Sequence, residues 1–196
     1  MGSGAFLNKE QSAGMELAAL LEKKKETILN EWFEQVIHTY APDSASFYQN
    51  QKDAFANPVG STTKQSLARL FTLLINSNDP DAVQQESPAD VIDPLVRIRA
   101  VQNFTPSRAV GFVFLLKPII RNHYKRHRKK ITLEALLDLE SRIDMLALTG
   151  FDVFMGCREK IYSLKTNTER DKIYKAFARA GLIKEVAADE PNPKFV

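Results

Sequence analysis

The sequence predicts an all-α fold, and three observations support this prediction. Apolar residues recur three and four positions apart along most of the 196-residue chain, which is the period of a helix, whereas no stretch alternates with the period of two that is typical of strands. Gly and Pro number 8 and 9, too few for the frequent turns of a β-sandwich. Hydrophobic residues make up 44% and charged residues 26% of the chain, which is typical of a globular domain. We therefore expect a bundle of about six to eight helices.

The segment 104–130 is expected to form the central helix of this bundle. Thr105 suits the N-cap, and Pro106 suits the first helical position, where its missing N–H is not needed. From Ala109 to Leu116 every residue is apolar or Gly, so we expect other helices to enclose this stretch on all sides. Pro118 removes a backbone donor inside the pattern and predicts a bend there.

Further helices are expected on both sides of this segment. Before it, the pattern predicts a long helix over 12–40 and a short helix over 44–56 with Phe47, Tyr48 and Phe55 facing inward. A turn at 57–60 follows, and then a helix capped by Ser61 or Thr62 that ends near 76. A loop over 76–81 comes next, and another helix follows the cap Ser87–Pro88. Near the end of the chain, Thr168 and Asp171 resemble a capping box that opens a last helix, which Gly181 ends. The expected domain organisation is a disordered N-terminus over 1–11, an all-helical domain over 12–168, and a C-terminal helix with a flexible tail over 169–196.

A long uninterrupted helical pattern follows the cap at Thr132. It exceeds the length that a small domain needs to cover itself, so we expect part of its apolar face to meet a second copy of the chain. The homodimer seam predicted in this way consists of Leu136, Leu139, Ile143, Leu146, Phe154 and Ile161. Gly150 and Gly156 indicate either close approach by a neighbouring element or a tolerated weakness of the helix.

The net charge of +3 is concentrated in one basic patch. Its members are Arg121, Lys125, Arg126, Arg128, Lys129 and Lys130. The first interpretation is that these cations complement the exposed carbonyls at the end of a helix, and an acidic protein partner is the alternative. Nucleic acid is not favoured as a partner, because the patch has neither an aromatic platform nor a recognition helix.

Templates of catalysis and of metal binding are missing from the sequence. There is no Gly-rich phosphate loop, no nucleophile elbow, no zinc-protease motif and no EF-hand. His123 and His127 lie four residues apart but stand among Arg and Lys, which repel a cation. We therefore predict no enzyme activity, no metal and no cofactor. The single Cys157, the lack of a signal peptide and the early interruption of the apolar run by Lys117 predict a cytoplasmic chain without membrane insertion.

A candidate ligand or partner site lies where the two central helices are expected to meet. It consists of Arg97, Arg99, Gln102, Ser107 and Arg108. Arg97 and Arg99 lie in an otherwise apolar segment, so each needs a partner if it is buried. The structural interpretation gives them carbonyls and carboxylates of neighbouring helices, with Asp93 and the turn at Asn57 as candidates. The functional alternative is an anion or partner site at the N-terminus of the central helix.

Two motifs carry a resemblance to a known family. DAFANPVG at 53–60 and VRIRAVQNFTPSRAVGFVFLLKPII at 96–120 resemble the N-terminal domain of RsbRD-type co-antagonists of RsbT, the sensor modules of bacterial stressosomes. The resemblance implies a globin-like, all-helical fold that binds no haem and dimerises. It also implies a non-catalytic sensory or adaptor domain that acts through homodimerisation and protein contacts. Full-length members carry a C-terminal STAS domain, which we do not expect in the short segment after residue 165, and the basic patch is not a feature of the family.

Two alternative functions stay open at the level of sequence. The first is a haem or small-ligand sensor, suggested by the fold that the resemblance implies and by the aromatic residues Phe104, Phe112, Phe114, Phe151 and Phe154. The second comes from the resemblance alone, because stand-alone versions of the domain occur in anaerobic, sulfur-respiring bacteria. It is a subunit or regulator of a redox complex of anaerobic sulfur metabolism.

Overall fold

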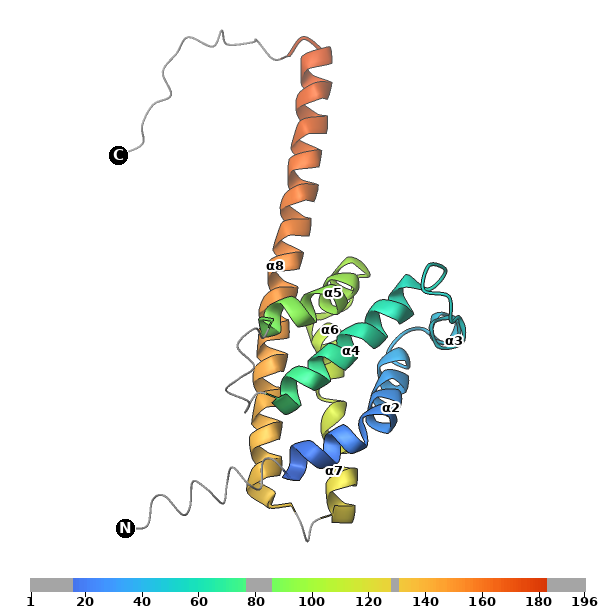
Figure 1. Cartoon of the computed structure of the whole chain (residues 1–196). Helices are drawn as coiled ribbons and strands as arrows, with labels where there is room; N and C mark the ends of the chain where they lie inside the picture. Colours follow the sequence, from blue (N-terminus) through green and yellow to red (C-terminus); the bar gives the residue numbers. More distant parts are fainter. Residues whose placement is uncertain (1–15, 77–85, 128–130, 183–196) are drawn as a thin grey trace, which may run out of the picture. The chain divides into compact units, whose positions relative to one another are not determined.

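The computed structural model describes residues 16–76, 86–127 and 131–182, and the chain forms two compact units, Met1–Arg158 and Glu159–Val196. Within the described ranges all regular structure is helical and no strand occurs. The predicted all-α bundle with a long C-terminal helix is confirmed (Figure 1). The expected disordered stretch at 1–11 lies outside the described residues, as does the tail from 183 onward.

The helices follow one another with short connections. In chain order they are α2 (Lys25–Ile37), α3 (Pro42–Asn50), α4 (Pro58–Asn76), α5 (Pro88–Val101), α6 (Pro106–Val110), the 3₁₀ turn η1 (Gly111–Val113), α7 (Leu116–His127) and α8 (Leu133–Arg179). A helical stretch at 16–23 precedes α2, and a turn at Lys24 separates the two. The single helix predicted over 12–40 is therefore divided in two.

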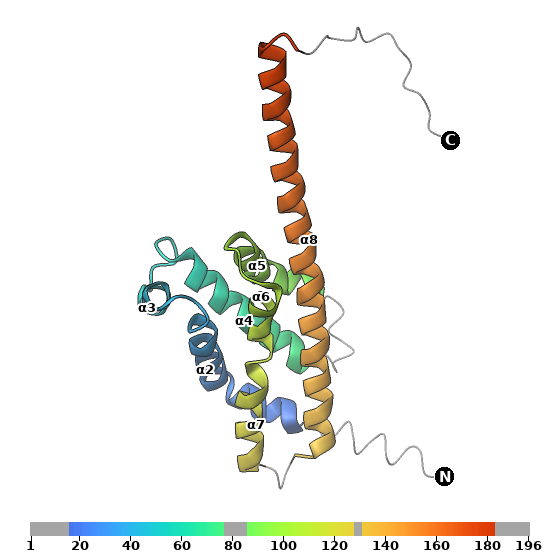
Figure 2. The same cartoon turned by 180° about the vertical axis from the view of Figure 1, so that it is seen from behind.

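The first unit is built around α4, which packs against α2 on one side and α5 on the other (Figures 1 and 2). Leu67, Leu70 and Phe71 of α4 are completely or almost completely buried. Trp32 of α2 is fully buried and donates its indole Nε1–H to the carbonyl of Phe112, 2.8 Å away. This bond ties α2 to the η1 segment, 80 residues later in the chain.

The predicted central helix is interrupted, and the predicted bend at Pro118 is wrong. The chain leaves α-helical geometry between Gly111 and Leu115. The amide of Lys117 bonds to the carbonyl of Phe114 at 3.1 Å, three residues back. Pro118 is then the third residue of α7, in the first turn, where a helix needs no amide donor. The residue that was expected to bend a helix lies at the start of one.

The apolar run in this segment is only partly enclosed. Ala109, Phe112 and Leu116 are buried, but Phe114 keeps 45% of its surface exposed. The expectation of neighbours on all sides is therefore wrong, and the helix itself is interrupted within the run.

The start of α4 also differs from the prediction, which assigned the cap to Ser61 or Thr62. The cap is Asn57, whose Oδ1 accepts the amide of Gly60 at 2.8 Å. Asn57 is buried, and its Nδ2 donates to the carbonyls of Tyr48 and Gln51, both at 2.9 Å. Asn57 and Pro58 thus act as N-cap and first helical residue. The NPVG motif closes α3 onto α4.

Some inward-facing residues predicted for the short helix are on the surface. α3 ends at Asn50, and the following residues form a loop in which Phe55 is 96% exposed. Phe47 is 48% exposed, whereas Tyr48 is partly buried and packs on the core. α3 is therefore shorter than the predicted helix over 44–56. The loop after it leads to Asn57, which caps α4.

Two other local predictions are confirmed in the first unit. Ser87 caps α5 by accepting the amide of Ala89 at 3.2 Å, with Pro88 next to it. At Gly150 a Cβ would lie 2.8 Å from Cδ1 of Ile92, which is the predicted close approach. Around Gly156 no atom of the described residues lies within 4 Å of such a Cβ. Its presence in α8 is a tolerated weakness.

In the second unit, α8 continues without a break to Arg179. The capping box predicted at Thr168 is wrong, since the hydroxyl of Thr168 donates to the carbonyl of Leu164 inside the helix at 2.8 Å. The helix ends at Gly181, as predicted. Gly181 has a φ of +67°, its amide bonds to the carbonyl of Ala178 at 3.1 Å, and the amide of Leu182 bonds to that of Phe177 at 3.0 Å. This pair of bonds is a Schellman motif.

Candidate functional site

Arg99, in the last turn of α5, is the most deeply buried residue of the predicted ligand or partner site, with 0% of its surface exposed. Its Nη1 donates to the carbonyl of Arg108 at 3.0 Å. Its Nη2 lies 3.1 Å from Oγ1 of Thr39 and 3.4 Å from the carbonyl of Val36. The guanidinium therefore joins the C-terminal end of α2 to the start of α6.

Three aromatic rings surround this guanidinium. Its Cζ lies 4.9 Å from the ring centroid of Phe112, 5.0 Å from that of Tyr40 and 5.2 Å from that of Phe104. We call these three residues the aromatic cage. Burial lowers the pKa of Arg99 and raises the pKa of Tyr40. Within the described residues Arg99 has no carboxylate partner, so carbonyl oxygens and ring faces stabilise its charge.

Arg108 joins the same cluster from the surface. Its Nη2 donates to the carbonyl of Thr39 at 2.9 Å, and its Cζ lies 5.3 Å from the ring centroid of Phe104. Both arginines thus donate to carbonyls at the end of α2, where a helix terminus favours cations. Of the interpretations offered above, the structural one accounts for these contacts.

The other predicted members of the site lie apart from this cluster. Arg97 forms an ion pair with Asp93 at 2.8 Å on the surface of α5, as the structural interpretation expected, and this hydrogen bond raises the pKa of Arg97. Gln102 and Ser107 are exposed. The predicted anion site at the start of a long central helix loses its basis, because α6 has only five residues.

Sequence reasoning missed the contribution of α2 to the cluster. Thr39 and Tyr40 lie 60 and 59 positions before Arg99, in the turn that ends α2. Neither residue stands out by composition or spacing. The aromatic Tyr40 near the end of a helix was the one available signal.

The basic patch is partly neutralised within the chain. Arg121 donates through Nε and Nη2 to both carboxylate oxygens of Glu140, each at 2.6 Å. These bonds lower the pKa of Glu140. Lys117 pairs with Asp144 at 2.6 Å. Glu140 and Asp144 of α8 thus connect this helix to α7 through two ion pairs.

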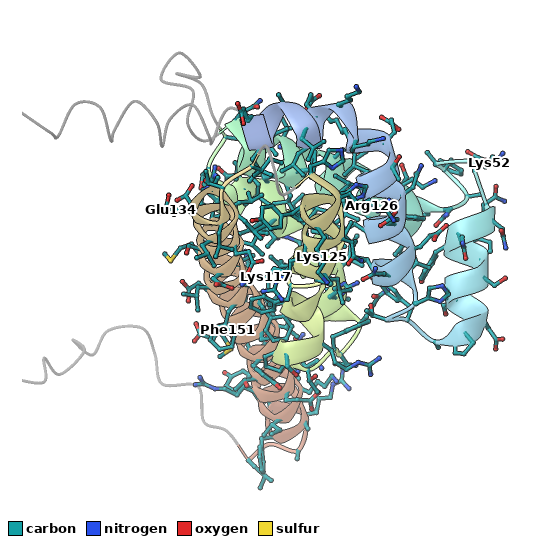
Figure 3. The ribbon with its side chains drawn as sticks, turned by 90° about the horizontal axis from the view of Figure 1, so that it is seen from below. Lys52, Lys117, Lys125, Arg126, Glu134 and Phe151 are labelled. Atoms are coloured by element: carbon teal, nitrogen blue, oxygen red, sulfur yellow. The ribbon has the colours of Figure 1, made fainter. Side chains whose placement is uncertain are left out.

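Of the remaining cations of the basic patch, two lie in the described part of the chain and three lie outside it. Lys125 and Arg126 are exposed in the last turn of α7 (Figure 3). Arg128, Lys129 and Lys130 lie outside the described residues. His123 is buried, which lowers its pKa. No group of three or more metal-ligand side chains occurs among the residues that the structure describes.

The predicted dimer seam on α8 is wrong in its residues. Leu136, Leu139, Ile143, Leu146 and Phe154 are each at most 5% exposed and belong to the core of the chain itself. Ile161 lies in the second unit and is partly exposed. α8 has one set of apolar side chains that is buried in the chain and another set that is exposed. The prediction, which used periodicity alone, assigned the buried set to the interface with a second copy.

A different set of apolar side chains on α8 faces solvent in the first unit. They are Leu133, Leu137, Met145, Leu148, Phe151 and Met155, between 38% and 62% exposed. We call this set the α8 stripe; Phe151 is labelled in Figure 3. Leu148, Phe151 and Met155 follow one another at intervals of three and four, so they share one helix face.

The aromatic residues suggested for a haem or ligand pocket do not form one group. Phe112 and Phe154 are buried in the core, whereas Phe114 and Phe151 are 45% and 44% exposed. Phe104 packs on Arg99. In the described part of the chain, no helix is long and apolar enough to cross a membrane.

One comparison with known proteins gives a match. The family model described as RsbT co-antagonist protein rsbRD N-terminal domain matches residues 26–167, in agreement with the resemblance found in the sequence. Searches of curated proteins and of solved structures give no significant match. The matched range contains the NPVG turn, the arginine cluster and the α8 stripe.

Proposed function

We propose, from the premise that the chain belongs to the family of RsbT co-antagonist rsbRD N-terminal domains, that it is a non-catalytic signalling domain that works as a homodimer through protein contacts. The α8 stripe is the observation that carries this proposal. Six large apolar side chains exposed along one helix are more than scattered surface hydrophobics, and contiguous exposed patches mark interaction surfaces. A cytoplasmic location, expected from the lone cysteine, belongs to the same proposal.

The size of the stripe is adequate for self-association. Burying a side chain such as Leu or Phe completely contributes about 1.5–3 kcal/mol, and these side chains have roughly half of that gain left. Two copies would bury both stripes, so the gain is counted twice. The sum is comparable to the cost of association, which is about 4–15 kcal/mol. A dimer of moderate affinity is the expected result.

Contacts inside the first unit connect the α8 stripe to α7 and α2, so a change at this surface would be transmitted to those helices. The ion pairs Arg121–Glu140 and Lys117–Asp144 couple α8 to α7, and α7 packs on α2. A change in how a partner holds α8 would reach α2 through these contacts. An acidic protein partner at the basic patch would use Lys125 and Arg126, because Arg121 is engaged with Glu140.

The decisive experiment compares oligomeric states by light scattering and sedimentation at micromolar concentration. The wild-type chain is expected to be a dimer. The double variant Leu148→Glu/Phe151→Glu removes two apolar contacts from each copy and places charge in the interface, so its dimer should be at least about a hundredfold weaker. Helical circular dichroism of this variant should match the wild type, since both positions are exposed.

Phe55→Glu is the matched control, because Phe55 is 96% exposed and lies outside α8. It should remain dimeric. A wild-type chain that is monomeric at all these concentrations would contradict the homodimer. A dimer that survives the double variant would contradict the stripe as its interface.

A further inference from the structure

The last part of α8, in the second unit, exposes every side chain from Ser163 to Leu182. Among them Ile173, Tyr174 and Phe177 are 55%, 56% and 48% exposed. An isolated helix of this length is marginal in water, and helices gain stability mainly by packing an apolar face. The exposed apolar residues therefore call for a surface outside the unit.

The segment 170–182 is amphipathic in a specific arrangement. Ile173, Phe177 and Ala180 share one face by their spacing of four and three. Lys172 and Arg179, seven residues apart, border this face on one side, and Arg170 borders it on the other. Asp171, the single carboxylate of the segment, lies on the far side of the helix together with Lys175, the fourth cation.

The end of the helix extends the apolar face. The Schellman bonds at Gly181 turn the chain so that Leu182 comes back toward the last helical turn. In this motif the residue after the glycine frequently contacts the residue whose carbonyl it binds, here Phe177. Leu182 is 70% exposed and adds a fourth large apolar side chain at the tip.

The charges argue against a second copy of the same helix as the occupant. Residues 170–182 carry four cations and one carboxylate. In a self-paired helix, the residues that border the apolar face come closest to the partner, and here they are cationic, so they would repel each other. Glu169, four residues before Ile173 and therefore at the same face, forms an exposed ion pair with Lys172 at 2.8 Å, and a surface pair of this kind offsets only a small part of the repulsion.

A flat anionic surface fits the arrangement. Interfacial helices place apolar side chains among the acyl chains, with Lys and Arg on both borders at the level of the headgroups. Tyr174, next to Arg170 on the border, is the kind of side chain that occupies this level. The lone carboxylate would point to water. A protein groove would not require the cations to lie on both borders with the acid opposite.

We propose that residues 170–182 form a membrane-surface helix that binds bilayers containing anionic lipid, lying on the bilayer without crossing it. Affinity comes from a few apolar residues and from attraction of the basic borders, each near-surface cation contributing about a fivefold factor. The binding is therefore reversible and sensitive to salt. This function is separate from the homodimer proposed for the first unit.

The test is co-flotation of the full chain with vesicles. The wild-type protein is expected to float with phosphatidylcholine vesicles that contain roughly one third phosphatidylglycerol and not with pure phosphatidylcholine, and about 0.5 M salt should release it. The variant Lys172→Glu/Arg179→Glu should lower the partition coefficient by about tenfold or more. Ile173→Ser/Phe177→Ser should lower it while leaving the charge unchanged.

The matched control is Lys125→Glu/Arg126→Glu, which makes the same change of charge on α7. It should float like the wild type. Flotation lost in this control but kept in Lys172→Glu/Arg179→Glu would overturn the assignment to α8. Absence of flotation with either vesicle would overturn the membrane proposal, and cross-linking from position 177 to an acidic protein in that case would identify a protein groove as the occupant. Light scattering on the same variants keeps this outcome distinct from failure of the dimer.

Discussion

The guanidinium of Arg99 lies 5.0 Å from the ring centroid of Tyr40, and each of the two side chains buries a polar atom, Nε of Arg99 and Oη of Tyr40, that has no hydrogen-bond partner among the described residues. Unsatisfied buried polar atoms are costly. They persist here because the remaining nitrogens of Arg99 hold the end of α2 and the start of α6 together. The cluster is a structural joint between three helices.

The first prediction follows from this joint. Arg99→Met removes the hydrogen bonds to the carbonyl of Arg108 and to the hydroxyl of Thr39, which join α6 and the end of α2, so it should lower the free energy of unfolding by about 1–3 kcal/mol. Arg97→Met changes an exposed pair with Asp93 and should stay within about 0.5 kcal/mol of the wild type. Urea denaturation followed by circular dichroism measures both values. Equal stability of the two variants would show that Arg99 is not a joint.

The second prediction uses two glycines of α8 as a pair. Ala at Gly150 would place its Cβ 2.8 Å from Cδ1 of Ile92 and 3.3 Å from Cγ1 of Val110. Ile92 is fully buried and cannot yield without disturbing its neighbours. Gly156 has open space around it. Gly150→Ala should therefore unfold at lower urea concentration than the wild type, whereas Gly156→Ala should gain about 0.5–1 kcal/mol from helix propensity.

Thermal unfolding of both variants tests whether the two positions differ or whether any Ala in α8 has the same effect. If the unfolding temperatures of both Ala variants shift in the same direction, the close approach of α5 and α6 to Gly150 does not limit the packing there.

Local signals in the sequence were sufficient for much of the fold. The cap Ser87–Pro88 and the end at Gly181 each depend on a few adjacent residues and on backbone geometry. The all-α class follows from periodicity. These features required no knowledge of which residues meet in space.

The features that sequence reasoning missed depend on residues far apart. Glu140 pairs with Arg121 across 19 positions, and Thr39 meets Arg99 across 60. Which apolar face of α8 is buried is a similar case. Leu146 and Leu148 are both apolar, and only packing against other helices makes the first 3% exposed and the second 60% exposed. A period shows that a helix has an apolar face and does not show which neighbour covers it.

The third prediction concerns the pH dependence of the α7–α8 contact. Hydrogen bonds from Arg121 lower the pKa of Glu140 below its unfolded value, which is about 4.3. The folded state therefore binds this proton less readily than the unfolded state, so the contribution to stability is complete above the unfolded pKa and is lost as the pH falls through the folded pKa. Relative to Glu140→Gln, the wild type should be more stable at neutral pH and should lose that advantage below about pH 4.

The control for this prediction is Glu159→Gln, an exposed position in the interior of the same helix, away from its first turn. Its stability should follow that of the wild type across the acid range. A constant difference between wild type and Glu140→Gln at every pH would mean that the carboxylate charge does not stabilise the contact, whatever its geometry.

The last prediction tests the NPVG turn. Asn57 accepts the amide of Gly60 and donates to the carbonyls of Tyr48 and Gln51, so Asn57→Ala removes a helix cap and leaves two partly buried carbonyls without their donor. The expected loss of unfolding free energy is about 2 kcal/mol, of which the cap contributes about 1 kcal/mol and the two carbonyls the rest.

Ser61→Ala, at the cap position that the sequence suggested, should change stability by less than about 0.5 kcal/mol. Gly60→Ala should be as damaging as Asn57→Ala, because its Cβ would overlap Nδ2 of Asn57 and would displace the side chain that makes all three bonds. Urea unfolding of the three variants decides the matter: a larger effect at Ser61 than at Asn57 would return the cap to the position predicted from sequence.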